Sequence, residues 1–339
     1  MADELPLVTV IMPIRNEADF IVRSLGAVLA QDYPPERVEI IIADGMSSDG
    51  TRAEIARLAA QHPERAITVI DNPRQIVPAG MNLAQGIARG EIIVRVDGHC
   101  EIAPDYISQC VAHLQRGEAG GVGGPIETVG QTPYGQSIAL AMSSWFGVGG
   151  AAFRTVKDRA LYADTLAFPA YRRDVIERAG PYDETLVRNQ DDEYNYRLRK
   201  LGFRLLLTPK IRSRYYSRAT LRRVWQQYYQ YGFYKVRVLQ KHPRQMSLRQ
   251  FVPPLFVAAL ILGGALAVFS PLARLLWALV IIAYAVVNLS TSAALAARHG
   301  WQHLRRLPLV FAALHLSYGL GFWHGVWHFG LQAKHATKN

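Results

Sequence analysis

The sequence predicts an α/β domain with a mostly parallel sheet, followed by an amphipathic helix and about three transmembrane helices. Apolar runs typical of buried strands alternate with helical periodicities up to Val96. All 27 carboxylates lie in residues 1–193, and long apolar runs with almost no charge follow residue 250. We therefore expect an α/β domain at residues 1–218, an amphipathic interfacial segment at 219–250 and a transmembrane region at 251–339.

Four apolar runs predict strands, at Leu7–Met12, Val38–Ala43, Ile67–Ile70 and Glu91–Val96, and the first two are typical of buried strands. The segments between them predict helices, one with apolar spacing from Ile21 to Leu29, one from Thr51 and one at Ala79–Ala88. Thr51 and Glu54 have the spacing of a capping box at the start of the second helix. Strands that alternate with helices imply a mostly parallel sheet covered on both faces.

The charge of the chain is divided sharply along its length. Residues 1–193 contain 17 of the 38 Lys and Arg, so this part is net −10 and the remainder is net +21. A basic segment of this kind is attracted to nucleic acid or to an anionic membrane surface. The apolar runs at about 251–270, 275–297 and 308–331 favour the membrane, because three such runs in succession have no polar face to show to water.

The compartment is predicted from the cysteines and the N-terminus. Cys100 and Cys110 are the only cysteines and form no Cys-x-x-Cys pair, which is typical of a reducing compartment. The residues before the first strand are acidic, and the run Leu7–Met12 is too short for the apolar core of a signal peptide. We therefore expect a multi-pass protein of the inner (plasma) membrane with its first domain in the cytoplasm.

Polar side chains follow three of the predicted strands. Arg15 and Glu17 come after the first strand, Asp44 follows the second, and Asp97 and His99 follow the fourth. In parallel α/β sheets, ligands bind beyond the carboxyl ends of the strands. A single site is therefore expected to collect these side chains.

Asp97-Gly98-His99 places a carboxylate and an imidazole two residues apart, so that both can reach one divalent cation. Carboxylate oxygens suit Mg²⁺ and Mn²⁺, and an imidazole shifts the preference toward Mn²⁺. Such a metal would neutralise a departing diphosphate. Taken alone, this motif and the stretch around Asp44 could equally be ordinary turns.

Four stretches occur in a fixed order: Pro13-Ile14-Arg15-Asn16-Glu17, the Asp44 loop, Asp97-Gly98-His99, and Asp191-Asp192-Glu193 with Arg197. Together they resemble the ordered motif set of family 2 glycosyltransferases over roughly residues 7–235. The resemblance implies the GT-A fold, a Rossmann-like domain for a nucleotide-sugar.

By this resemblance, Pro13, Arg15, Glu17, Asp44 and Asp97 would bind the nucleotide-sugar. Glu17 and Asp44 would hold the nucleoside, with Asp44 at the edge of the base.

Asp97 and His99 would stand in the place of the family's Asp-x-Asp motif, which holds the ribose and the metal. Asp191 would be the catalytic base that accepts the proton of the acceptor hydroxyl. Further residues would support the site or contact the acceptor, namely Asp192, Glu193, Arg197 and Arg172.

The sequence departs from the family pattern at three places. Gln190 replaces the Glu before the base, and His99 replaces the second Asp of Asp-x-Asp. The Arg that many relatives carry at the position of Met81-Asn82 is missing, so another cation, Arg74, is expected to face the phosphates.

Three further stretches resemble the bacterial exopolysaccharide type, that of succinoglycan glucosyltransferases: Val96–Glu101, Tyr171–Arg173 and Asn189–Glu193. This resemblance implies an inverting transfer of glucose from UDP-glucose to a sugar on a lipid such as undecaprenyl diphosphate. Three alternatives stay open: a polyisoprenyl-phosphate glycosyltransferase, a processive polysaccharide synthase, and a membrane-tethered protein that binds a nucleotide-sugar without reaction. The first needs no base like Asp191, and the second usually carries a Gln-x-x-Arg-Trp motif that this chain lacks.

Thr220–Lys241 contains no acid and repeats apolar residues at helical spacing, which predicts an amphipathic helix against anionic headgroups. The alternative is a helix packed on the first domain. Arg274 falls in the predicted outer loop and Arg298, Arg305 and Arg306 in the inner one, so three spans would place the C-terminus outside.

The last apolar run holds His324 and His328 at i, i+4 spacing, for which we favour packing or a lipid diphosphate contact over a metal. Gly321 and Gly325 in the same run form a small-xxx-small pair that could let helices approach closely.

Overall fold

The computed structural model describes residues 5–336, and the chain divides into two compact units. The first unit contains Met1–Glu127 and Ala152–Tyr216, and the second contains Thr128–Ala151 and Ser217–Asn339. Residues 128–151, which lie inside the range expected for the α/β domain, therefore group with the C-terminal helices.

The first unit is built on an eight-stranded sheet with the order β3-β2-β1-β4-β9-β6-β10-β8. The four predicted strands are confirmed as β1 (Val8–Ile14), β2 (Val38–Asp44), β3 (Ala66–Asp71) and β4 (Ile92–Arg95), all parallel to one another. The later strands are β6 (Gly121–Gly123), β8 (Leu161–Tyr162), β9 (Ala170–Arg172) and β10 (Leu205–Leu207), of which β9 is antiparallel to β4 and β6.

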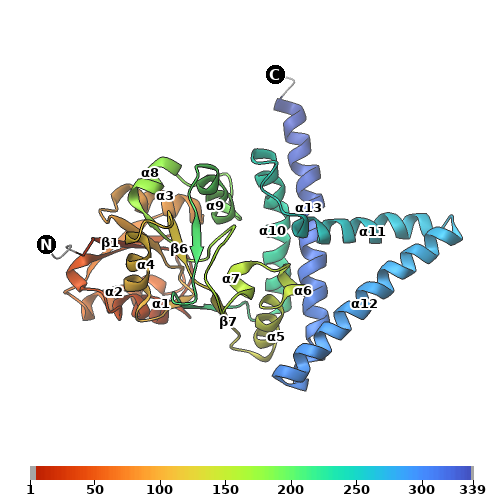
Figure 1. The fold of residues 1–339 in the computed structure, drawn as a ribbon, viewed down its shortest axis with the longest axis horizontal. Helices are drawn as coiled ribbons and strands as arrows, with labels where there is room; N and C mark the ends of the chain where they lie inside the picture. The colour runs from red at the N-terminus through yellow and green to blue at the C-terminus, as the bar shows by residue number, and fades with distance from the viewer. Residues whose placement is uncertain (1–4, 337–339) are drawn as a thin grey trace. The chain divides into compact units, whose positions relative to one another are not determined.

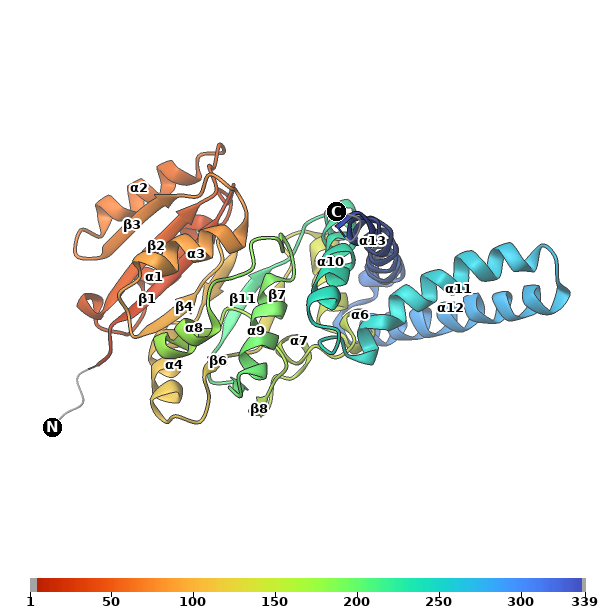
Figure 2. The same cartoon turned by 90° about the horizontal axis from the view of Figure 1, so that it is seen from above.

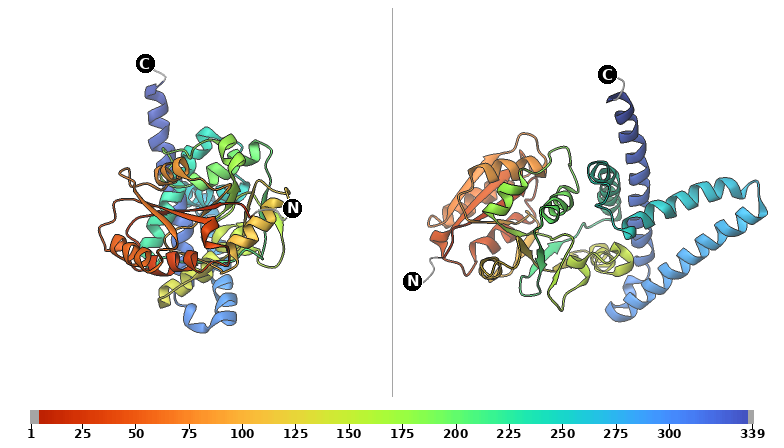
Figure 3. Two further views of the ribbon diagram at one scale, coloured as in Figure 1. Left: turned by 90° about the vertical axis from the view of Figure 1, so that its left-hand side faces the viewer. Right: turned by 45° about the horizontal axis from the view of Figure 1, so that its top comes forward.

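Helices cover both faces of this sheet (Figure 1 and the left view of Figure 3). The helices α3 (Val77–Ile87), α8 (Arg173–Ala179) and α9 (Gln190–Lys200) share one core on one face, which includes Met81, Val175 and Leu198. The helices α1 (Ile21–Leu29) and α2 (Thr51–Gln61) pack against each other on the opposite face. The unit also contains η1 (Pro35–Arg37), α4 (Tyr106–Gln115) and the short α7 (Ala152–Thr155).

The predicted capping box at Thr51 and Glu54 is wrong. The N-cap of α2 is Gly50, whose φ of 90° suits glycine, and no side chain caps the helix. The hydroxyl of Thr51 instead accepts from the backbone N–H of Glu17 at 2.9 Å. This bond ties the start of α2 to the loop after β1.

A second, three-stranded sheet has the order β5-β11-β7, formed by Cys100–Ile102, Ser213–Tyr216 and Ile126–Val129. Since β5 comes directly after His99, this sheet fixes the chain that leaves the loop after β4. The backbone N–H of Tyr216 donates to the carbonyl of His99 at 3.2 Å.

The second unit is helical. It contains α5 (Pro133–Met142), α6 (Trp145–Val148), α10 (Leu221–Lys241), η2 (Leu248–Phe251), α11 (Val252–Ala267), α12 (Pro271–His299), η3 (Trp301–His303) and α13 (Leu307–Ala336). Three segments are long and apolar enough to cross a membrane, at Leu248–Ala267, Pro271–His299 and Leu307–Leu331, close to the predicted runs. The helices α11 and α12 form a hairpin (Figure 2).

The predicted close approach at Gly321 and Gly325 is confirmed, and the partner is α10. A Cβ on Gly321 would lie 2.0 Å from the carbonyl oxygen of Tyr229, and one on Gly325 would lie 2.5 Å from that of Phe233. The predicted amphipathic helix is thus present as α10 and packs along α13.

Candidate active site

The loops after β1 and β4 meet through Glu17 and His99. Oε1 of Glu17 lies 2.8 Å from Nδ1 of His99, and each side chain is 14% exposed. Gly98 permits this approach, because a Cβ there would lie 2.6 Å from Cγ of Glu17. Burial disfavours the charged imidazolium, but the hydrogen bond and negative charge of Glu17 outweigh it and raise the pKa of His99 to about 9.

Arg95, the last residue of β4, holds Asp97. Its Nε donates to Oδ1 of Asp97 at 2.7 Å, and a terminal nitrogen donates to Oδ2 at 3.0 Å. The Arg95 side chain is 7% exposed. Although burial disfavours its charge, the negative charges of Asp97 and Asp191 hold the pKa of Arg95 above its ordinary value. Arg95 thus links the loop after β4 with the start of α9.

Asp191 lies in the first turn of α9, which begins at Gln190. Its Oδ1 accepts from the backbone N–H of Asp192 at 2.9 Å. Burial raises the pKa of the Asp191 carboxyl, and the positive charge of Arg95 opposes this rise. A partly desolvated carboxylate of this kind has the basicity to accept a proton from a bound hydroxyl.

Buried tyrosines surround this part of the unit. The rings of Tyr182 and Tyr194 stack with their centroids 4.0 Å apart, and the hydroxyl of Tyr171 donates to Asn195 at 2.6 Å. Burial and the negative charge of Asp191 raise the pKa of Tyr182, and the positive charge of Arg95 opposes this rise.

Asp44 belongs to a second cluster, at the adjoining ends of β2 and β3. It is fully buried and pairs with Nε of Arg52, whose terminal nitrogen pairs with Asp71 at 2.5 Å. The backbone N–H of Ser47 donates to Asp44 at 3.1 Å. A direct contact between Asp44 and a nucleobase would therefore require Arg52 to move.

The remaining predicted residues differ in their surroundings. Pro13 is buried within β1, and Arg15 is exposed beside Gly45. Arg74 pairs with Glu184, whose other oxygen accepts from the amide of Asn82 at 2.8 Å.

Glu193 and Arg197 form an i, i+4 pair at 2.9 Å within α9, and Arg197 also donates to the carbonyl of Pro181. This network holds the chain that precedes α9. Arg172 pairs with Asp174 and lies opposite Ile92, at the amino end of β4 and thus far along that strand from Asp97.

Contacts thus join Glu17 with His99 and Asp97 with Arg95, and the charge of Arg95 couples Asp97 with Asp191. Arg95 was missed by the sequence analysis. A signal was present, since Arg95 is the one charged residue of the apolar strand Ile92–Arg95 and stands two residues before Asp97.

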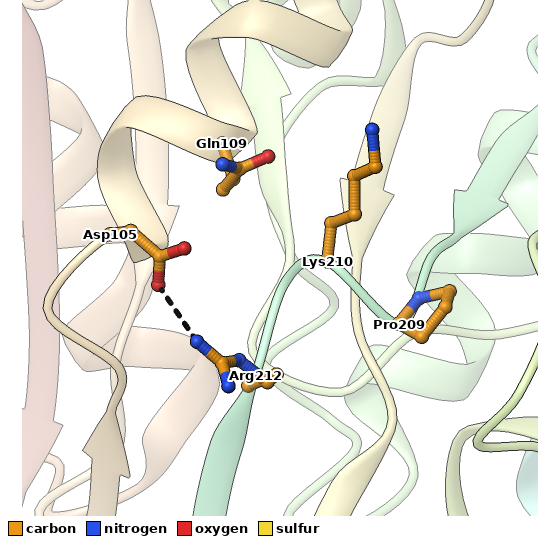
Figure 4. A pocket seen from close by; sticks show the side chains of 5 residues that line it. All are labelled: Asp105, Gln109, Pro209, Lys210 and Arg212. Carbon is orange, nitrogen blue, oxygen red and sulfur yellow. Dashed lines mark ion pairs between the residues drawn. The ribbon is translucent and has the colours of Figure 1, made fainter.

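A separate surface cavity of about 390 Å³ lies beside the start of α4 (Figure 4). It is lined by Asp105, Gln109, Pro209, Lys210 and Arg212, and Arg212 lies 3.6 Å from Asp105. None of these residues belongs to the site formed by Glu17, Asp97, His99 and Asp191.

Comparison with known proteins defines the class. Among solved structures, the mannosyltransferase PcManGT from Pyrobaculum calidifontis, in complex with GDP-Man and Mn²⁺, aligns with a TM-score of 0.60 at 22% identity, over 96% of this chain and 88% of that chain. GalNAc-T7 with UDP, GalNAc and Mn²⁺ aligns with a TM-score of 0.53 at 17% identity, over 70% of this chain and 48% of that chain. The first unit therefore has the GT-A fold of glycosyltransferases, as predicted.

Sequence comparison then gives the family. Residues 9–180 match the model of Glycosyl transferase family 2. The chain is 31% identical to the succinoglycan biosynthesis protein ExoA of Rhizobium meliloti (strain 1021), over 93% of each chain. It is 28% identical to the dolichyl N-acetyl-alpha-D-glucosaminyl phosphate 3-beta-D-2,3-diacetamido-2,3-dideoxy-beta-D-glucuronosyltransferase of Methanococcus voltae, over 69% of this chain and 74% of that one. The chain belongs to glycosyl transferase family 2 and is a nucleotide-sugar-dependent glycosyltransferase.

Proposed function

We propose that this enzyme is an inverting glycosyltransferase that moves glucose from UDP-glucose onto a hydroxyl of a lipid-linked saccharide. The acceptor lipid would be an undecaprenyl diphosphate in exopolysaccharide or other cell-surface glycan synthesis, and the first unit would work in the cytoplasm at the inner membrane. The observation that carries the proposal is the position of Asp191, a partly desolvated carboxylate coupled through Arg95 to Asp97. A phosphate acceptor is already ionised and would not need such a base.

In this mechanism Asp191 accepts the proton of the acceptor hydroxyl as its oxygen bonds to the anomeric carbon of the sugar. The bond between that carbon and the diphosphate oxygen breaks, and its electron pair leaves with the nucleoside diphosphate. Attack from the face opposite the leaving group inverts the anomeric configuration. Positioned general bases of this type contribute about 10²–10⁴-fold to rate.

The residues of the loop after β4 fit a divalent metal, Mn²⁺ or Mg²⁺. Metal-bound imidazoles usually donate their other ring N–H to a carboxylate. Glu17 is that carboxylate at Nδ1 of His99, which leaves Nε2 to bind the metal. Among the side chains that the structure describes, those of residues 5–331, no three His, Cys, Asp or Glu gather to form a complete site. Two protein donors, Asp97 and His99, suit a metal whose shell is completed by phosphate oxygens and water. When bound, it would neutralise charge on the diphosphate. The two similar structures with Mn²⁺ support this proposal.

The nucleoside would lie against the ends of β1 and β2, where Glu17 and Asp44 are joined through the start of α2. Asp44 would act there through Arg52 and Ser47, which it holds in place. Pro13 sets the direction of the chain that leads to Arg15, which is exposed and available to the donor. Glu193 and Arg197 would support α9 beneath the acceptor.

The test is to incubate membranes that contain the enzyme with a panel of labelled nucleotide-sugars and to extract the lipids. We expect label from UDP-glucose in the organic phase as a lipid-linked saccharide with an inverted anomeric centre. Label in the lipid phase from another donor would correct the sugar. Nucleotide release without label in any lipid would contradict the acceptor class.

A further inference from the structure

The helix α10 packs along the middle of α13, and the outer side of α10 carries exposed polar residues. Close contacts pair Gly321 with Tyr229 and Gly325 with Phe233, and the ring of Phe329 packs at a tilt against those of Phe233 and Tyr234. The residue numbers rise together, so the two helices run parallel. The side chains that α10 leaves exposed include Arg222, Arg223, Gln226, Gln230, Gln240 and Lys241. If α13 crossed the bilayer, this polar face would be carried into the hydrocarbon, where charged side chains are costly.

The start of α11 meets α13 near its middle. Nε1 of Trp323 donates to the carbonyl of Pro254 at 2.8 Å, and a Cβ on Gly319 would lie 2.6 Å from the carbonyl of Pro253. Gly319 is twelve residues beyond Leu307, about 18 Å along a helix. If Leu307 lay at the inner surface of a core about 30 Å thick, the first turn of α11 would begin beyond its midplane. The hairpin could not then cross the membrane from one side.

The hairpin and α13 also differ in exposure and direction. The most apolar stretch of α13 is 56% buried and has a mean hydropathy of 1.2. The corresponding stretches of α11 and α12 are 17% and 6% buried, and their mean hydropathies are 1.9 and 2.1. Beyond its first turns α11 packs on α12, where Nε1 of Trp277 donates to the carbonyl of Leu260. In Figure 2, α13 is seen nearly end-on while α11 and α12 extend across the view. The hairpin therefore leaves α13 at a steep angle.

The exposed face of α13 is apolar and aromatic. It includes Leu320, Trp323, Val326 and Trp327, of which Trp327 is 65% exposed, and His324 is the one exposed polar side chain among residues 320–327. Trp side chains concentrate at the boundary between headgroups and acyl chains. The paired helices thus have a polar side on α10 and an apolar side on α13.

We propose that α10 and α13 lie together in the plane of the membrane surface, with the exposed face of α13 against lipid, and that only the α11–α12 hairpin crosses the bilayer. The catalytic unit precedes α11 without an intervening span, so it is on the side from which α11 enters. Two crossings return the chain to that side, and the C-terminus stays with the catalytic unit. The loop charges allow this, since Arg298, Arg305 and Arg306 remain inside.

The first test is labelling of introduced cysteines by an impermeant maleimide in intact cells and in permeabilised cells. The native Cys100 and Cys110 are buried, so the unmodified chain provides the background. Phe269 lies in the turn of the hairpin and is 85% exposed, so Phe269→Cys should react from outside. Gln302→Cys and Thr337→Cys should react only after permeabilisation. Reaction of Thr337→Cys from outside, with Gln302→Cys still protected, would overturn the proposal.

The second test measures depth along α13. Leu309, Leu320 and Leu331 are exposed and spaced by eleven residues, three helical turns, so they share one face. A fluorophore on a single cysteine at each position should be quenched alike by lipids brominated at a given acyl depth. A spanning helix would separate successive positions by about 16 Å, with strong deep quenching at position 320 alone. That graded pattern would contradict the proposal even if the tail could not be labelled.

Discussion

Arg95 donates to both carboxylate oxygens of Asp97, at 2.7 and 3.0 Å, from the last position of a strand in the middle of the sheet. The same guanidinium acts electrostatically on Asp191. One buried cation therefore balances the carboxylate proposed for the donor and the one proposed for the acceptor.

Replacing Arg95 should affect both carboxylates. In Arg95→Gln the positive charge that opposes the rise in the Asp191 pKa is lost, so this pKa should rise further. The acidic limb of the pH–rate profile, the part where activity falls with decreasing pH, should therefore move to higher pH. Breaking a buried pair typically costs about 3–5 kcal/mol, and less where one partner can reach water as Asp97 can. Thermal unfolding and a pH–rate profile measure the two effects.

Arg95→Lys is the matched control, because it keeps the charge and loses the two-pronged hydrogen bond. We expect its acidic limb to stay near that of the parent enzyme. An unchanged limb in Arg95→Gln would remove the proposed coupling to Asp191.

The Glu17–His99 pair should make stability depend on pH. The folded pKa of His99, about 9, lies above its ordinary 6.5, so the pair stabilises fully below pH 6.5 and its contribution is lost as pH rises through 9. The loss is at most about 3 kcal/mol. Urea unfolding of the purified enzyme at pH 6 and pH 10 measures it, and His99→Gln should show a smaller difference. Equal pH dependence in both proteins would mean that His99 is not charged in the fold.

Metal dependence should follow from Asp97 and His99. We expect EDTA to abolish transfer and Mn²⁺ or Mg²⁺ to restore it. Glu17→Gln, which weakens the support of the His99 ring, should raise the metal concentration for half-maximal activity by about 10–100-fold. Full activity in the chelator would leave Asp97 as a ribose contact without a metal.

Much of the fold follows from local patterns, and the exceptions have physical causes. The strands β1, β2 and β4 are runs rich in β-branched residues and buried on both faces, so composition alone marks them. The strand β3 has a similar composition, although it lies at the exposed edge of the sheet. The convergence of Glu17, Asp97 and His99 follows from the rule that strand ends meet at one edge of a parallel sheet. Arg95 was missed because its position as a lone cation in an apolar strand is only a weak signal, which is the same whether the side chain faces water or a buried carboxylate. The capping box failed because Gly50 already makes the turn that Thr51 was expected to cap. The grouping of residues 128–151 with the C-terminal helices depends on distant contacts such as that of Ser137 with His303, which no local pattern contains.

The most direct measurement of the central claim uses Asp191→Asn with Asp174→Asn as its control. Both residues hold the second position of their helices, α9 and α8, so the two variants share any effect on the helix start. Asn keeps the shape of Asp but cannot accept the proton. In membranes supplied with nucleotide-sugar and lipid acceptor, Asp191→Asn should lose at least ~10²-fold in transfer rate while it still binds the donor and inserts normally, and Asp174→Asn should transfer at close to the parent rate. Near-parent turnover by Asp191→Asn would show that Asp191 only stabilises the helix and that the base is another residue.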